Sequence, residues 1–479
     1  LDDSLIHLRY AINLDHLHFV TYDGIHHTFG TSSPLYLVLL AAVYAIVPGV
    51  FVPKAVSVVI YIALLLFTAH LVLRDRNNTV SRTVAFLLLV SFVSPMGVRW
   101  LADGMESGLV CLAAMALAQA AISAIDSENA TAPIVMLALG LGMTLLRIEL
   151  LALCGVCAMA IFFGKLGRTS SGPRKAFLSA APVVLGGILA MLIVHWAFGN
   201  FLPDTALAKA YNKPSLNGIT VFFRLMAASF ALGLGTFLLW VVSLVAALRT
   251  KNPVGTLTLL AANSMFPLLV VLACARGQAV QGVRYFIWAM LFSLVWNLYA
   301  ISATPETTSV PRYGYTLAAT AVVIALLLVP DTYFGAHTML GRSRTFQQMH
   351  HAGFDHLSGH LMLADDIGFI GYFTQANVCD LNGLVNGRSF AALTQQQRIQ
   401  ACINQHPDAL FLTTQRLGMM HAYLPNLNRD WIACKEIDFP NVRSNDSHYL
   451  VVRTPLADQL CPAGQQRQSL VSILGPAGS

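Results

Sequence analysis

Residues 132–164 read APIVMLALGLGMTLLRIELLALCGVCAMAIFFG, an apolar stretch in which Arg147 and Glu149 are the charged residues. A helix rises 1.5 Å per residue, so roughly 20 apolar residues cross the hydrocarbon core of a bilayer. A stretch of this length with a charged pair at its centre predicts two membrane helices joined by a tight polar turn.

The rest of the chain has a similar composition. Hydrophobic residues make up 56% of the 479 positions and charged residues only 11%, whereas a soluble domain carries about 25% charge. This composition excludes an ordinary soluble protein. In a membrane protein an excess of lysine and arginine mainly sets the orientation in the bilayer, so the net charge of +6 does not indicate nucleic-acid binding. We predict about ten spans, near residues 54–73, 81–95, 107–125, 132–147, 149–164, 176–197, 220–248, 255–274, 283–303 and 313–330.

The apolar segment 35–47 is too short to cross the bilayer, so we interpret it as an interfacial helix. Without it, the basic loops near residues 74–82, 165–175, 249–251 and 312 all fall on one side, which the positive-inside rule makes cytoplasmic. If this segment crossed the bilayer, the first basic loop would lie opposite the others. The positions of the basic loops therefore favour ten spans that do not include segment 35–47.

Residues 331–479 have the composition of a soluble protein, with short apolar runs between polar turns. We predict an α-helical polytopic membrane domain over residues 1–330 and an extracytoplasmic α/β domain over 331–479. The expected elements of the second domain are strands at 361–364, 409–412 and 449–452 and a helix at 395–405.

The soluble domain contains an even number of cysteines. In an oxidising compartment, four cysteines predict two disulfides, for which three pairings are possible. The candidates are Cys379, Cys402, Cys434 and Cys461.

The chain opens with Leu1-Asp2-Asp3, with no apolar segment before the two aspartates. We therefore expect a further membrane span before residue 1. The two carboxylates can be interpreted in two ways. They suit the positive end of a helix dipole, and they could equally take a proton from an acceptor hydroxyl just outside the membrane.

Several other charged residues fall on the predicted extracytoplasmic face. An ionisable group in the bilayer costs about 2.5–3.5 kcal/mol on insertion scales and is read as a functional hypothesis. Simpler roles compete with this one: loop solubility, a structural ion pair at the hairpin, or a lysine that reaches the headgroups. The residues concerned are Arg9, Arg99, Asp103, Glu106, Arg147, Glu149, Asp204, Lys209, Arg276, Arg284 and Tyr285.

A histidine-rich segment raises the question of a metal. His350, His351, His356 and His360 are close in sequence, but glycine interrupts the segment and no other ligand type recurs at fixed spacing. We expect no required cofactor or metal site and leave a divalent ion open. There is no nucleotide-binding glycine motif either.

Short motifs recur in one order along the chain. They are Asp2-Asp3, Arg9-Tyr10-Ala11 with Asn13-Leu14, Gly30-Thr31-Ser32-Ser33-Pro34-Leu35, Gly104-Met105-Glu106, Arg147-Ile148-Glu149, Gly199 to Lys209, Arg284-Tyr285 and Asp380-Leu381-Asn382-Gly383-Leu384. In this order they resemble the GT-C glycosyltransferases, most closely the cell-wall arabinofuranosyltransferases. Ile148 and Tyr36 stand where that family has proline and tryptophan, which leaves the sugar and the acceptor open.

The resemblance implies a transferase in a bacterial inner membrane, with its active face and soluble domain extracytoplasmic. The donor would be a polyprenyl-phosphate sugar, and the acceptor a glycan, a glycolipid or a surface protein. Asp2 or Asp3, together with Glu106, would be catalytic. The implied phosphate ligands are Lys209, Arg284, Arg147 and Tyr285, and the implied cavity residues are Arg9, Arg99, Asp103, Glu149, Asp204 and Arg276.

Three alternatives remain at this point. A mannosyl- or aminoarabinosyltransferase of the same fold would share these motifs. A secondary transporter would place its charges near the bilayer midplane and show inverted repeats. A scaffold protein would not need acids and bases in five separate loops.

Overall fold

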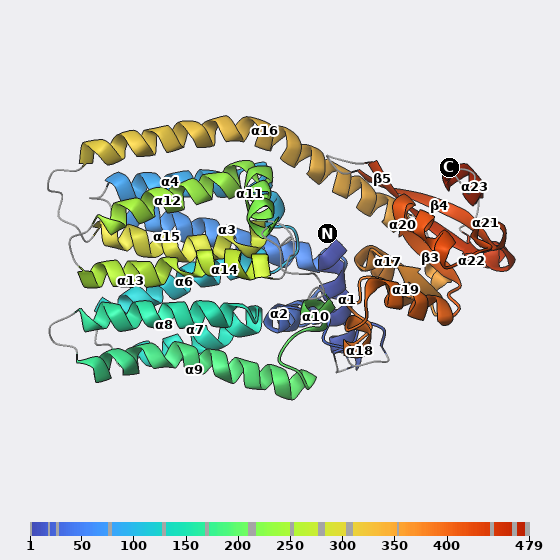
Figure 1. Ribbon diagram of the computed structural model, residues 1–479, viewed down its shortest axis with the longest axis horizontal. Helices are drawn as coiled ribbons and strands as arrows, with labels where there is room; N and C mark the ends of the chain where they lie inside the picture. Colours follow the sequence, from blue (N-terminus) through green and yellow to red (C-terminus); the bar gives the residue numbers. More distant parts are fainter. Residues whose placement is uncertain are drawn as a thin grey trace.

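The computed structural model describes residues 2–17, 20–24, 28–74, 79–126, 131–167, 172–208, 217–249, 253–275, 283–302, 310–351, 354–440, 445–461 and 467–474. Figure 1 shows a bundle of long helices that lie side by side and a smaller mixed domain beyond one end of the bundle. The bundle contains α3 (Val52–Arg74), α4 (Thr79–Val93), α6 (Ser107–Asp126), α7 (Ala132–Leu146), α8 (Leu150–Leu166), α9 (Pro173–Phe198), α12 (Thr236–Leu248), α13 (Pro253–Asn263), α15 (Ile287–Ser302) and α16 (Val310–His351).

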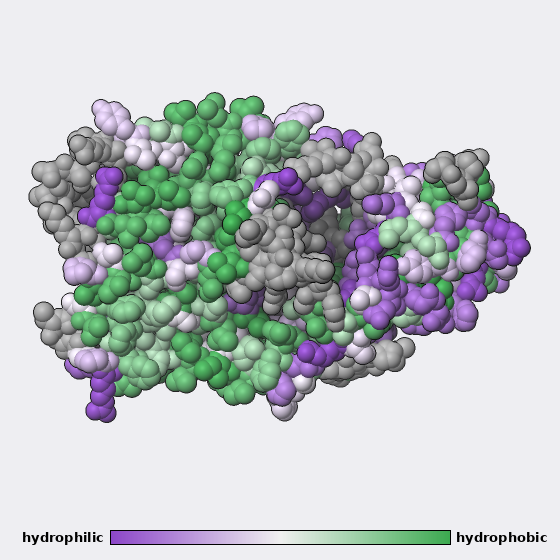
Figure 2. All heavy atoms as spheres, viewed as in Figure 1, coloured by the Kyte–Doolittle hydropathy of each residue, from purple (hydrophilic) through white to green (hydrophobic). Residues whose placement is uncertain are grey.

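Among the described residues, six helices are long and apolar enough to cross a membrane. A seventh span is present if α4 and α5 (Pro95–Leu101), which meet at a bend of 76°, are one broken span. The chain is thus a multi-pass helical membrane protein by length and composition. The surface of the bundle is largely apolar, whereas the smaller domain is hydrophilic, as Figure 2 shows.

The predicted spans are all helical, but fewer than ten of them have full crossing length. The helices α7, α8 and α15 have 15, 17 and 16 residues. The predicted span 220–248 is divided into α11 (Asn217–Ala228), a π-helical turn η1 (Ala231–Gly235) and α12. The break lies at Phe230, whose φ of 38° no regular helix allows.

The predicted span 255–274 is also divided, into α13 and α14 (Met265–Ala275). The short helix α15 is nevertheless central: its residues from Ile287 to Leu298 are buried. A helix that is apolar all round and buried is satisfied by protein neighbours, so it does not need the length of a lipid-facing span.

The helix α16 marks the thickness of the lipid-facing band. Tyr315 and Tyr333 are exposed on it, as are Val322, Leu326 and Val329 between them. Tyrosines collect at both membrane–water interfaces, and the interval between these two spans about 27 Å at 1.5 Å per residue. The helix continues beyond Tyr333 to the smaller domain, so the predicted domain boundary at residue 330 falls inside a helix.

Short helices cover the end of the bundle that faces the smaller domain (Figure 1). They are α1 (Asp2–Leu17), α2 (Pro34–Ile46) and α10 (Asp204–Ala208). The helix α2 has 13 apolar residues, too few to cross, and it exposes Val38 and Ile46. The expected helix is thus present, and its place at the membrane interface stays a prediction.

The smaller domain is built on a six-stranded sheet of order β2-β1-β3-β5-β4-β6. The strand β1 is parallel to β2 and β3, and the other pairs are antiparallel. The strands are β1 (Leu361–Ala364), β2 (Asn377–Asp380), β3 (Ala409–Thr413), β4 (Trp431–Pro440), β5 (Asn445–Arg453) and β6 (Gln468–Ser469). The helices are α17 (Ile367–Thr374), α18 (Arg388–Ala391), α19 (Gln395–Asn404), α20 (Thr414–Met419), α21 (Leu427–Asp430), α22 (Ala457–Leu460) and α23 (Leu470–Leu474). The three strands and the helix expected from the sequence are confirmed.

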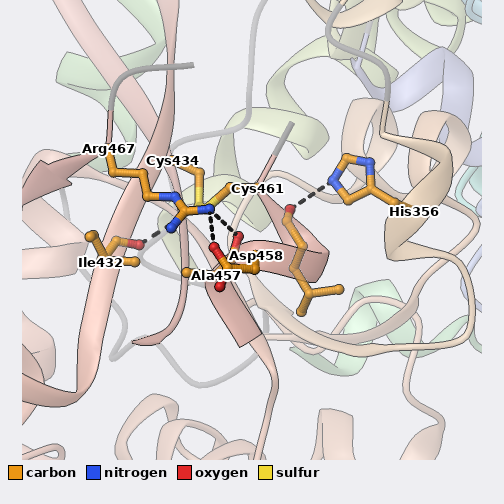
Figure 3. Close-up of a disulfide and its surroundings, with 8 residues drawn as sticks. His356, Ile432, Cys434, Ala457, Asp458, Cys461 and Arg467 are labelled. Carbon is orange, nitrogen blue, oxygen red and sulfur yellow. Dashed lines mark hydrogen bonds and ion pairs between the residues drawn. A yellow bond between two sulfur atoms is a disulfide. The ribbon is translucent and has the colours of Figure 1, made fainter. Parts of the chain in front are cut away.

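Two disulfides connect the four cysteines of this domain. Cys379 pairs with Cys402 and Cys434 with Cys461, which selects one of the three pairings. The second disulfide attaches α22 to β4, and Arg467 donates a hydrogen bond of 2.7 Å to Asp458 on the same helix (Figure 3). Such cross-links stabilise a small domain by restricting its unfolded chain.

Candidate functional site

The helix α1 places Asp3 and His7 on one face, because residues four apart lie one turn above each other. Arg284 belongs to a short 3-10 turn, η2 (Val283–Tyr285), just before α15. Its Nη2 lies 2.9 Å from Asp3 Oδ2, although 281 residues separate the two in sequence. The first predicted acid and a predicted phosphate-binding cation thus meet directly.

A second ion pair lies beside the first. Arg147 ends α7, and Glu106 immediately precedes α6. Arg147 Nη1 lies 2.9 Å from Glu106 Oε1, and both side chains are buried. Arg147 Nε also donates to Glu149 Oε1 at 2.6 Å. The charged pair that interrupts the 33-residue apolar stretch is therefore satisfied inside the protein.

Two side chains connect these ion pairs. His7 Nε2 lies 3.8 Å from Glu106 Oε2, so one turn of α1 spans from Asp3 to Glu106. The ring of Tyr285 lies between the arginines: the Cζ atoms of Arg147 and Arg284 are 4.4 and 5.4 Å from its centroid. Cation–π contacts of this kind hold guanidinium planes in place. We call Asp3, His7, Glu106, Arg147, Glu149, Arg284 and Tyr285 the charged site.

Burial sets the protonation states within the charged site. It lowers the pKa of His7, which Glu106 opposes only in part. Burial also works against ionisation of Glu106, but the guanidinium of Arg147 prevails and holds the pKa of this carboxyl below its usual value. At neutral pH the site therefore contains an ionised Glu106 beside a neutral His7, which lies 3.1 Å from the hydroxyl of Thr31.

The turn before Glu106 is pressed against α1. Gly104 has a φ of 95°, and a Cβ there would lie 3.0 Å from Ser4 Cβ, so only glycine fits. In the same turn Asp103 Oδ1 accepts a hydrogen bond from the Met105 amide at 3.0 Å. Burial raises the pKa of Asp103. Its carboxylate supports the turn.

Among the described residues, four of the predicted cavity residues lie outside the charged site: Asp103, in the turn above, and Arg99, Asp204 and Arg9. Arg99, on α5, contacts Met96 Sδ at 3.6 Å and the ring of Trp100. Asp204 accepts the Phe29 amide at 3.1 Å through its carboxylate, so it holds two loops together. Its side chain is buried, and its place in a substrate cavity stays a prediction.

Arg9 is the fourth. Its Nε donates to the Tyr22 carbonyl at 2.7 Å and its Nη2 to the Ala376 carbonyl at 3.1 Å, while Nη1 donates to the carbonyl of Gly371. Gly371 and Ala376 belong to the sheet domain. Arg9 therefore fixes α1 to that domain, and its place in a substrate cavity stays a prediction.

The remaining sequence motifs meet at the same boundary. Gly30 lies between the hydroxyl of Tyr10 and the carbonyl of Leu384, and a Cβ would overlap both. Asp380 accepts the amides of Asn382 at 2.8 Å and Leu384 at 2.5 Å, which shapes the loop that reaches Gly30. Segments near the beginning and the end of the chain thus meet at the boundary between the bundle and the sheet domain.

Some predictions fall on positions that the structure does not describe. Lys209 and Arg276 lie outside the described residues, as does the side chain of Asp2. Of the four histidines considered for a metal, His356 bonds the Leu460 carbonyl at 2.7 Å and His360 bonds Asp408 at 3.0 Å. Within the described part of the chain, no group of three or more potential metal ligands gathers.

A further polar cluster lies at the carboxyl ends of β1 and β3. His448 Nε2 is 3.6 Å from Asp365 Oδ1 and 3.5 Å from Asp366 Oδ2, and Arg416 Nε is 3.9 Å from Asp365 Oδ2. Burial raises the pKa of Asp365 to about 6. Sequence reasoning missed this cluster and also His7. A usable signal existed for each: Asp365 directly follows a buried strand, and His7 follows Asp3 by one helical turn.

Comparison with known proteins adds one relation. Residues 338–460 match a family described as a domain of unknown function (DUF8728). The match covers the end of α16 and most of the sheet domain, and it leaves out the charged site. No curated protein matches the chain.

Proposed function

We propose that this protein is a GT-C-type membrane glycosyltransferase that uses a polyprenyl-phosphate sugar as donor. The sugar that the resemblance favours is arabinofuranose, and the acceptor is an extracytoplasmic glycan, glycolipid or surface protein at a bacterial plasma membrane. The observation that carries the proposal is the contact of Arg284 with Asp3 beside the contact of Arg147 with Glu106. Acids and cations from four separate segments thereby converge at one end of the bundle.

The donor phosphate has a cationic partner in this arrangement. Arg284 Nε is buried and has no hydrogen-bond acceptor among the described residues. A phosphate oxygen is a suitable acceptor, because guanidinium groups bind phosphate through two parallel N–H groups. The phosphate would compete with Asp3 for Arg284, and the cation would stabilise the charge that develops on the leaving group.

The competition between the phosphate and Asp3 for Arg284 also accounts for the general base. Once the phosphate takes Arg284, the ion pair between Arg284 and Asp3 is broken, and the carboxylate of Asp3, whose side chain is 46% exposed, can accept a proton. The acceptor hydroxyl then forms a bond to the anomeric carbon, the bond from that carbon to the phosphate oxygen breaks, and polyprenyl phosphate leaves. The hydroxyl proton goes to Asp3, with Asp2 as the alternative acceptor. Glu106 keeps Arg147 in place.

A secondary transporter fits the arrangement less well. Transporters bind their cargo near the bilayer midplane, whereas the charged site lies at the end of the bundle, under α1 and the sheet domain. A transporter also has no use for a soluble domain fixed to that end by buried arginine contacts.

The test uses the purified full chain and a panel of polyprenyl-phosphate sugars: arabinofuranosyl, mannosyl and aminoarabinosyl. Released polyprenyl phosphate is measured with and without acceptor glycan. We expect one donor to be consumed, and Asp3→Asn to reduce kcat by about a hundredfold or more, the usual contribution of a general base. Arg284→Gln should act mainly on KM for the donor.

Asp15→Asn is the matched control. Asp15 lies on the same helix about three turns beyond Asp3 and pairs with His16 at 3.7 Å, so the turnover of this variant should equal that of the unsubstituted protein. Full turnover in Asp3→Asn would remove the assignment of the base. Failure of the unsubstituted protein to consume any donor in the panel would remove the proposed function.

A further inference from the structure

A groove of about 340 Å³ lies between α8 and α9. Its lining is entirely apolar and includes Ala158, Met159 and Phe162 from α8 and Phe177 and Ala181 from α9. Met159 and Phe177 are exposed, so the groove opens on the outer surface of the bundle, where the neighbours of a membrane protein are lipids. The groove is several turns from Arg147 and contains none of the charged site.

The local sequence explains the shape of the groove. Pro182 lies inside α9 and cannot donate to the carbonyl of Leu178, an arrangement that bends helices. The small side chains of the alanines at 158, 180 and 181 leave space within the groove. Phenylalanines at 162 and 177 form walls on the two helices. The result is a slot for a flexible apolar chain.

Two exposed cations of α9 lie near one end of this groove. Arg174 lies three residues before Phe177, so it continues the face that lines the groove. Lys175 is exposed beside Arg174. Positive charge on α9 therefore lies next to one end of the apolar groove.

The amino end of α9 adds to this charge. The helix has 26 residues and begins at Pro173, and its N-cap Gly172 provides no side-chain cap. The first amide groups of such a helix lack intrahelical acceptors, and the helix dipole favours an anion there. Two cations and a helix amino end thus point to a single phosphate group at the mouth of the groove.

We propose that the groove binds one anionic phospholipid of the leaflet at the bundle end remote from the sheet domain. An acyl chain lies between α8 and α9, and the phosphate contacts Arg174, Lys175 and the amino end of α9. A zwitterionic lipid can supply the same chain but adds a cationic headgroup beside these cations. The site is independent of the proposed transferase activity.

The experiment compares lipids on the purified full chain by native mass spectrometry. The protein is loaded with phosphatidylglycerol or phosphatidylcholine of the same acyl chains, and the fraction of protein that retains lipid is measured. We expect preferential retention of phosphatidylglycerol. The double variant Arg174→Gln, Lys175→Gln should weaken its retention roughly thirtyfold, since each cation near a lipid headgroup contributes about fivefold.

Matched variants separate the groove from the charge. Ala181→Phe fills the groove and should reduce retention of both lipids, whereas Leu192→Phe, on an exposed and apolar part of α9 outside the groove, should not. Arg249→Gln removes an exposed cation at the end of α12 and should leave retention unchanged. Equal retention of the two lipids by the unsubstituted protein would overturn the proposal.

A photo-crosslinking phosphatidylglycerol provides a measurement without any substitution. Crosslinked peptides should come from α8 and α9, and their yield should fall when unlabelled phosphatidylglycerol is added. Crosslinks confined to other helices would overturn the site even if one of the variants fails to fold.

Discussion

Four buried arginines differ in what their guanidinium groups contact. Arg147 and Arg284 face carboxylates and the ring of Tyr285. Arg9 and Arg398 face backbone carbonyls, and Arg398 donates to Asn382 and Ala391 at 2.6 and 2.7 Å. A carbonyl contact fixes the backbone in place, whereas a cation paired with a movable carboxylate can exchange partners. The first pair is therefore suited to ligands and the second to holding domains together.

Replacing Arg9 by lysine tests this distinction. Lysine keeps the charge but cannot direct donors to three carbonyls at once. Charge-assisted hydrogen bonds contribute about 1.5–3 kcal/mol each, so we expect the docking of α17 on α1 to weaken by a few kcal/mol. Hydrogen exchange of the amides near Gly371 and Ala376, measured by mass spectrometry, should accelerate.

Arg388→Lys is the control for this change. Arg388 is more exposed, and its single domain-bridging bond to the Leu202 carbonyl is long, at 3.5 Å, so exchange near α17 should not change. Unaltered protection in Arg9→Lys would show that the sheet domain docks without this arginine.

Asp365 should make the sheet domain less stable as the pH rises. Its pKa is raised to about 6 in the folded domain from an ordinary value of 3.8, so the folded state holds the proton more tightly than the unfolded one. The free energy of unfolding therefore falls as the pH rises from about 4 to about 6, by at most about 3 kcal/mol at 1.36 kcal/mol per pKa unit.

Asp365→Asn should remove this share of the pH dependence and stabilise the domain at pH 7. The measurement is pulse proteolysis of the full chain across this pH range. Asp430→Asn, at an exposed ion pair with Arg429, should leave the profile as it is. If Asp365→Asn also leaves the profile unchanged, burial of this carboxyl does not affect stability.

At the scale of elements, small residues determine how closely two of the membrane helices approach. A Cβ on Gly140 of α7 would overlap the carbonyl of Val183 on α9, and one on Gly186 would overlap the carbonyl of Leu137. Glycine at these positions lets the two backbones touch, as at other small-residue contacts in membranes. The helices α7 and α9 form a close pair that carries the Arg147 turn at one end.

Alanine substitutions on α7 make a direct test. Gly140→Ala should destabilise the bundle by about 1–3 kcal/mol, because the backbone of α9 has no room to move aside. Gly142 is two residues away on the same helix, and a Cβ there would meet nothing within 4 Å. Gly142→Ala should therefore be neutral or slightly stabilising. Thermal unfolding in detergent measures both, and equal midpoints would contradict the close contact.

The sequence alone predicts some helices and strands and misses others, for physical reasons. Continuous apolar runs locate both the bundle helices and the buried strands β1 and β3. The strand β4 was missed because Lys435 and Glu436 interrupt its apolar pattern, where the register also shifts. The break at Phe230 was missed because a left-handed residue within an apolar run leaves hydropathy unchanged.

At the scale of the whole molecule, the sequence predicts which residues belong to the candidate site better than it predicts what they contact. Motif order nominated Asp3, Glu106, Arg147 and Arg284, and they converge. The order of the motifs could not show that the side chain of Arg9 contacts the sheet domain, because the direction of a side chain depends on contacts with residues hundreds of positions away in the sequence. Charged residues can be selected from a sequence, whereas their partners come from the fold.

The two ends of the bundle should be accessible from opposite sides of a membrane. The lipid-facing interval of α16 separates the charged site from the connections at the far end, where Thr131 and Arg249 are exposed. Phe201 and Gln396 are exposed at the other end and in the sheet domain. If the apolar band of the bundle is the bilayer-spanning part, single cysteines at these four positions must divide into two pairs.

Each position is replaced by cysteine in a background that contains Cys274→Ser. Cys111, Cys154 and Cys157 are buried, and the other four are in disulfides. A membrane-impermeant maleimide added to right-side-out vesicles should label Phe201→Cys and Gln396→Cys, and inside-out vesicles should reverse the pattern. Labelling of Phe201→Cys and Thr131→Cys from the same side would place both ends of the bundle in one compartment. The charged site could then no longer face away from the basic loops, and the orientation on which the transferase proposal depends would be lost.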